Sequence, residues 1–96
     1  MKLLVNWKMR EGKLHEALAV FSQMTAEQDQ AQMGDGIELI GRWHDLSRGT
    51  GTAIFEVEDQ SAFTKTALMW NPFMEFELSL VTDDEETREI GRQIGS

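Results

Sequence analysis

The order of strand-like and helix-like segments constrains the fold of this 96-residue chain more than any other feature of its sequence. Four short segments alternate in polarity, are rich in apolar and aromatic residues, and are bounded by turn-forming residues, which is typical of strands. Other segments carry apolar residues every three or four positions, which is typical of helices packed on one side. Strands are predicted at residues 2–7, 37–44, 52–57 and 76–81, and helices at 13–26, 61–70 and 83–94.

The first helix is predicted from a single apolar stripe that fades near Ala26. The polar run at residues 27–32 either continues this helix or frays, and Gly34–Asp35–Gly36 ends it. The stripe is formed by Leu14, Ala17, Leu18, Phe21 and Met24.

This βαββαβα order predicts a ferredoxin-like α+β fold with an added C-terminal helix. Two right-handed crossovers place the first and third strands at the centre of a four-stranded antiparallel sheet, with both crossover helices on one face. A chain of this length supplies one hydrophobic core, so we expect a single domain over residues 1–96.

The charge and composition argue against several classes of function. Seventeen acidic residues and nine scattered basic residues give a formal charge of −8, so phosphates and anionic lipids would be repelled. We therefore expect neither nucleic-acid nor membrane binding. The chain has no cysteine, which excludes disulfides and thiolate metal sites. It shows no leader and no long apolar segment, so we expect a cytoplasmic protein.

Alternation along the predicted strands divides their side chains between two faces of the sheet. One set is apolar throughout and should lie beneath the helices; it includes Trp7 and Trp43, which we expect to fill the core rather than to stack on a ligand. The other set mixes polar residues with Leu4, Ile40 and Ile54. Because such a face is too apolar for water, we expect a second copy to cover it in a two-fold homodimer.

The mixed face also supplies a candidate ligand site. Arg42 and His44 lie two apart on the second strand and share a face, where the guanidinium would hold a carboxylate and the imidazole would donate or accept a proton. The alternative is a polar network that satisfies itself within the dimer interface. The candidate ligand-binding residues are Asn6, Arg42, His44, Glu56, Glu77 and Trp70.

The chain resembles a family of short bacterial proteins, the domain-of-unknown-function 3303 family. The resemblance is carried by Gly41–Arg42–Trp43–His44, by Phe55–Glu56–Val57 on the next strand, and by the acidic run Asp83–Asp84–Glu85–Glu86 after the last strand. It runs over nearly the whole chain and implies a dimeric α/β barrel. The resemblance transfers no catalytic residue.

Dimeric barrels of this kind include cofactor-free monooxygenases and haem-degrading enzymes. Asn6 and Trp70 are similar to positions used by the haem-degrading group, which also needs a histidine on its second helix. No histidine follows His44, so we expect no haem and no other cofactor. With only His15 and His44 present, and no metal-binding spacing, we expect no metal site.

Three functions remain open from the sequence, and it does not decide whether the protein is an enzyme. The first is binding of a small polar or anionic molecule in a cleft lined by Arg42 and His44. The second is a non-catalytic module that regulates or scaffolds a partner protein. The third is an enzyme similar to the cofactor-free monooxygenases.

Overall fold

The computed structural model describes residues 1–95 and contains a four-stranded antiparallel sheet with the order β2-β3-β1-β4. This order confirms the ferredoxin-like prediction, with the first and third strands at the centre. The strands are β1 (Lys2–Met9), β2 (Ile37–Asp45), β3 (Thr50–Val57) and β4 (Met74–Val81).

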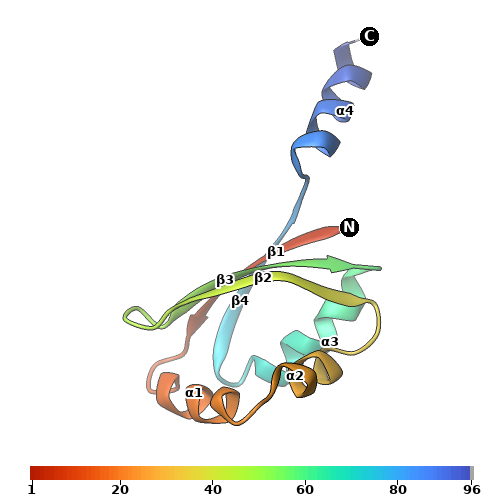
Figure 1. Ribbon diagram of the computed structural model, residues 1–96. Coiled ribbons are helices and arrows are strands. Elements are labelled where there is room, and N and C mark those ends of the chain that lie inside the picture. The colour runs from red at the N-terminus through yellow and green to blue at the C-terminus, as the bar shows by residue number, and fades with distance from the viewer. Residues whose placement is uncertain (96) are drawn as a thin grey trace.

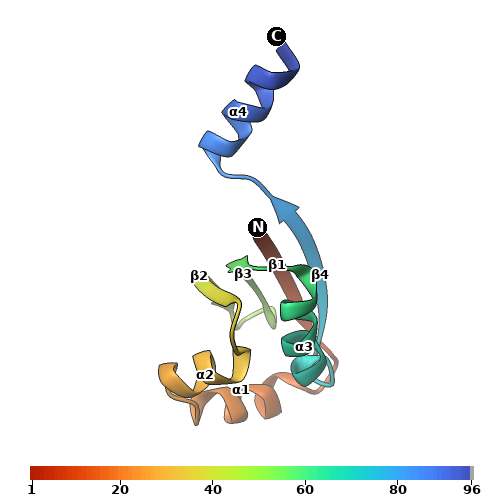
Figure 2. The same cartoon turned by 90° about the vertical axis from the view of Figure 1, so that its right-hand side faces the viewer.

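Three helices lie beneath one face of the sheet, and a fourth stands away from it (Figure 1). Figure 2 shows the same arrangement edge-on, with the opposite face of the sheet left open. No helix within residues 1–95 is long and apolar enough to cross a bilayer. The helices are α1 (Leu14–Ser22), α2 (Ala26–Met33), α3 (Gln60–Trp70) and α4 (Asp84–Gly95).

The core lies between the sheet and the three helices. Phe63 of α3 is 2% exposed and packs on Phe55 of β3, with ring centroids 5.1 Å apart. Burying a side chain of this size removes enough apolar surface from water to contribute about 1.5–3 kcal/mol. The central strands β1 and β3 supply most of the buried residues around it, namely Leu3, Val5, Trp7, Ala53, Phe55 and Val57.

The segment after α1 is a separate helix rather than an extension of the first. Met24 donates to the carbonyl of Phe21 as α1 ends, and Thr25 then caps α2. The Gln28 amide donates to the Thr25 hydroxyl (3.1 Å), and the Thr25 amide donates to the Gln28 side chain (2.9 Å). This reciprocal capping box satisfies two amides that a helix start would leave without partners. The prediction of one helix that continues or frays was therefore wrong.

A β-bulge in β2 reverses the predicted faces of its second half. Leu39 pairs with Phe55, but Gly41 pairs with Ile54, so one extra residue lies in β2 between these pairs. An extra residue shifts the alternation, and every later side chain changes face. Arg42 and His44 consequently face the helices. Trp43, predicted to fill the core, lies on the open face and is 59% exposed.

Candidate functional site

A cavity of about 90 Å³ lies between the covered face of the sheet and α1, α2 and α3. Its walls are mainly aromatic and aliphatic side chains. Polar atoms come from only a few residues, which is the usual composition of a small-molecule site. The aromatic lining includes Trp7, Phe21 and Trp70, and the polar lining residues are Asp29, Arg42, His44 and Thr66.

Phe21 of α1 is the centre of the aromatic wall. Its ring centroid lies 5.4 Å from that of His44 and 6.4 Å from that of Trp70. Trp7 of β1 also lines the cavity, and its ring centroid lies 5.5 Å from that of His44 in an edge-on arrangement. The Trp7 indole lies over Gly51, where a Cβ atom would sit 2.0 Å from the ring. Glycine at position 51 is therefore what allows Trp7 to lie flat against β3.

Arg42 and Asp29 form an ion pair within the cavity wall. The guanidinium of Arg42, on β2, donates to the carboxylate of Asp29, on α2. Only 19% of the Arg42 side chain and 12% of the Asp29 side chain are exposed. The guanidinium also lies over the Phe21 ring, 4.9 Å from its centroid, where the ring face attracts a cation. The positive charge predicted to hold a ligand carboxylate is thus already matched by Asp29.

His44 lines the cavity and is also exposed to solvent, so it lies at the cavity mouth. Burial of the imidazole lowers its pKa below 6.5, and the nearby Arg42 charge lowers it further, while Asp29 acts in the opposite direction. The ring is therefore mostly neutral at pH 7, and in that form one nitrogen donates a hydrogen bond and the other accepts one.

Thr66 supplies a buried hydroxyl without a partner. The residue is 7% exposed on α3 and lines the cavity, and its Oγ1 has no hydrogen-bond partner among residues 1–95. Trp70, one turn later, differs in this respect because its indole N–H donates to the Gln32 side chain (3.1 Å). An unsatisfied buried hydroxyl is unfavourable by about 1–3 kcal/mol, so a group that bonds to it would bind favourably.

Comparison with known proteins identifies the family of this chain. The family model described as "Domain of unknown function (DUF3303)" matches residues 1–95. The chain belongs to this family. The match confirms the resemblance drawn from Gly41–Arg42–Trp43–His44. No curated protein matches the sequence.

Two solved structures resemble this DUF3303 chain. One is an L-rhamnose mutarotase from Formosa agariphila, with 14% identity and a TM-score of 0.48, covering 86% of this chain and 94% of that one. The other is an uncharacterized NIPSNAP domain protein from Burkholderia xenovorans, with 14% identity and a TM-score of 0.49, covering 88% of this chain and 97% of that one. No residue role is transferred from either.

The structure of this DUF3303 protein divides the six candidate residues between the two faces of the sheet. Arg42, His44 and Trp70 come together in the cavity. Asn6 and Glu77 are paired neighbours on the open face. Glu56 also lies there, where it accepts from the N-terminal ammonium group (2.8 Å). The sheet separates most members of the two groups, although Asn6 and His44 both line a second hollow beside Gly51 and Thr52.

Sequence reasoning missed three residues of the cavity. Phe21 was assigned to the apolar stripe of the first helix, and Thr66 was not among the residues considered. Asp29 was counted only as part of the polar run at residues 27–32, although it lies four positions before the buried Met33 and so shares its helix face. The four-residue spacing between Asp29 and Met33 was the sequence signal that could have placed Asp29 on the buried side of the helix. Within residues 1–95, no group of three or more histidine, aspartate or glutamate side chains is placed to hold a metal ion.

Proposed function

We propose that this protein binds a small, planar and largely apolar molecule that carries one hydroxyl or similar polar group. The molecule would lie in the cavity against Phe21, Trp7 and Trp70, and its polar group would bond to the Thr66 hydroxyl. The observation that carries the proposal is the unpartnered Thr66 Oγ1 at a cavity with aromatic walls.

The charges at the site favour a neutral ligand over an anion. An anionic ligand would have to displace Asp29 from Arg42, and the carboxylate released would lose its partner in a partly buried place. A neutral hydroxyl or carbonyl group can bind without displacing Asp29 from Arg42. Neutral His44 at the mouth offers a second hydrogen bond that does not depend on ligand charge. The expected ligand is therefore less polar than the sequence suggested.

The size of the cavity requires α1 to move outward when a ring binds. At about 90 Å³ the cavity is smaller than the cavity of about 150 Å³ that accommodates benzene in a protein core. Helix α1 can make this movement, because Ala17 is its only buried residue and Val20 is 44% exposed. Gly12, with φ +75°, forms the turn that precedes the helix.

Phenol and toluene test the proposal, since they differ in the polar group and have similar shapes. Phenol should raise the melting temperature of the wild-type protein more than toluene does. In the Thr66→Val variant this preference should disappear. The Thr64→Val variant is the matched control, because Thr64 is exposed on the same helix and donates to the Gln60 carbonyl (3.1 Å); it should keep the wild-type preference.

Thr66→Val also makes a prediction without any ligand. Valine has nearly the shape of threonine and removes the unsatisfied hydroxyl, so the variant should be as stable as the wild type or up to about 1 kcal/mol more stable. Denaturant unfolding measures this. A clearly less stable variant would mean that the hydroxyl serves the fold, and equal responses to phenol and toluene in the wild type would refute the proposed ligand.

A further inference from the structure

Three rows of lining residues run from the interior of the cavity to its mouth. The first row is on β2, where Arg42, His44 and Leu46 follow one another in steps of two, with Leu46 in the turn beyond the strand. Only 19% of the Arg42 side chain is exposed, whereas Leu46 is 51% exposed. This row therefore ends in an aliphatic side chain that reaches water.

The second row lies on β1 and ends at the same place. Val5, Trp7 and Met9 line the cavity, and the exposed fraction rises from 1% at Val5 to 8% at Trp7, while Met9 is only partly buried. The Met9 amide donates to the carbonyl of Gly49 in the hairpin turn (2.7 Å). This hydrogen bond holds Met9 beside the turn that carries Leu46.

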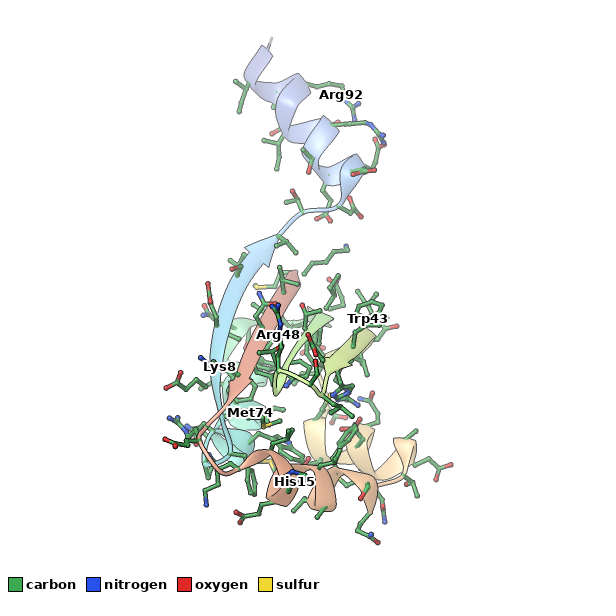
Figure 3. The ribbon with its side chains drawn as sticks, turned by 90° about the vertical axis from the view of Figure 1, so that its left-hand side faces the viewer. Lys8, His15, Trp43, Arg48, Met74 and Arg92 are labelled. Atoms are coloured by element: carbon green, nitrogen blue, oxygen red, sulfur yellow. The ribbon has the colours of Figure 1, made fainter. Side chains whose placement is uncertain are left out.

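The third row is the apolar stripe of α1. Leu14, Leu18 and Phe21 line the cavity at steps of four and three residues, so they share one side of the helix. Phe21 is the inner end of this row, and Leu18 is 37% exposed. Figure 3 views the molecule from this end, with the hairpin turn that carries Arg48 above the helix that carries His15.

The outer part of the cavity is apolar on all three sides. None of the described residues that line it outward of His44 is charged or carries an N–H or O–H group on its side chain. Aliphatic surface that lies next to a cavity and reaches water favours an apolar group that covers it. The residues of this outer groove are Met9, Leu14, Leu18 and Leu46.

We propose that the ligand is elongated, with a hydroxyl-bearing ring inside the cavity and an unbranched aliphatic chain that leaves through the outer groove, between α1 and the hairpin turn. This inference rests on the function proposed above and adds the chemistry of the second half of the ligand. An alkyl-substituted phenol is the simplest molecule of this class.

The orientation of the ligand follows from where the polar atoms lie. The Thr66 hydroxyl is buried and has no hydrogen-bond partner within residues 1–95, so the polar end of the ligand belongs in the interior. The reverse orientation would leave that hydroxyl unsatisfied and would place a polar group against Leu18 and Leu46. A cavity of about 90 Å³ also has no room for both a ring and a chain, so further carbons can extend only toward the mouth.

The length of the outer groove sets the length of the chain. Two residues of extended strand span about 7 Å, which is the distance that the chain must cover from His44 to Leu46. An extended hexyl group has about this length. The affinity should therefore rise steadily with chain length up to hexyl.

Calorimetric titration with phenol, 4-ethylphenol, 4-butylphenol and 4-hexylphenol tests the proposal. In the wild-type protein the Kd should fall by about twofold to fourfold for each methylene, the upper value being that for complete burial. Leu46→Ser and Leu18→Ser should each reduce the gain from phenol to 4-hexylphenol by at least about threefold, because each removes aliphatic surface from the groove. Both should leave the Kd of phenol itself within about twofold.

Val20→Ser is the matched control for Leu18→Ser. Val20 lies on the same helix and is 44% exposed, but it does not line the cavity. The variant should keep the full gain along the series, which separates binding in the groove from nonspecific adhesion of longer chains. Circular dichroism shows whether each variant is folded, and Leu46 in the exposed turn provides a second site if Leu18→Ser is not.

The outcomes distinguish this inference from the proposed function. Phenol binding that depends on Thr66, together with a Kd that does not change along the series, would refute the chain and leave the proposed function intact. A gain that Leu46→Ser and Val20→Ser reduce equally would also refute it. Conversely, a gain that depends on Leu46 without any effect of Thr66→Val would support the groove and overturn the proposed bond to the Thr66 hydroxyl.

Discussion

The two faces of the sheet differ in how completely the chain buries them. On the covered face, three helices bury the apolar residues of β1 and β3, and the remaining space is a small cavity with polar groups in its wall. On the open face, a half-apolar surface and an amphipathic helix remain in contact with water. The covered face therefore determines the stability of the single chain.

The β2 strand links the two faces, because its bulge decides which residues belong to each. Arg42 and His44 contribute to the wall of the cavity, while Trp43 lies exposed on the open face. The most distinctive run of the sequence thus serves both faces at once. The different roles of the covered and the open face can be tested by substituting residues on each face separately.

Truncation on the covered face should have the largest effect. Phe63→Ala removes a ring that is 2% exposed and should reduce the free energy of unfolding by about 3–5 kcal/mol. Leu68→Ala, on the same helix but 63% exposed, should change it by less than about 0.5 kcal/mol. Urea unfolding of both variants provides the comparison. Similar losses for the two would show that the covered face does not dominate stability.

Breaking the Arg42–Asp29 pair should have an intermediate effect. Asp29→Ala leaves the guanidinium partly buried without its carboxylate, and we expect a loss of about 2 kcal/mol, below the range for fully buried pairs because some of each side chain reaches water. The double variant Asp29→Ala/Arg42→Met should recover part of this loss. Denaturant unfolding measures this loss. If Asp29→Ala changed the free energy of unfolding no more than a surface substitution does, Arg42 would not lie on the face of β2 that packs against the helices.

Most of the fold could be predicted because it follows from local patterns. The strand order required only the succession of strands and helices and the handedness of their connections, and the apolar residues of β1 and β3 alternate without interruption. The bulge could not be predicted from alternation. Ile40 and Trp43 are both apolar and fit either face, so the side-chain pattern of β2 is compatible with two registers. Its pairing with β3 selects one of them.

The candidate site could be predicted only in part, because the bulge in β2 also decides which face Arg42 and His44 share. Arg42 and His44 were correctly placed on one face together, since their spacing of two residues is unaffected by a bulge before them. Which face they share depends on Ile40, and that error grouped them with Asn6, Glu56 and Glu77 instead of with Asp29. Distant partners such as Asp29 depend on how α2 turns after Thr25, which is a tertiary feature.

The titration of His44 offers the smallest and most local test. Its pKa should lie below 6.5 because the folded protein partly buries the ring next to Arg42. Arg42→Met should raise this pKa, and Asp29→Asn should lower it, because Asp29 opposes the other two effects. Proton NMR of the imidazole follows all three titrations. A His44 on the open face would respond to neither substitution.

The same pKa makes a prediction about stability. A histidine whose pKa is depressed by folding contributes fully above its unfolded pKa near 6.5, and that contribution is lost as the pH falls through the lower folded pKa. The difference in unfolding free energy between the wild type and His44→Gln should therefore shift in favour of the variant as the solution is acidified. Because the ring is at the cavity mouth, the shift should be small. A difference that favoured the wild type increasingly in acid would place the imidazole beside a carboxylate instead of in the apolar mouth beside Arg42.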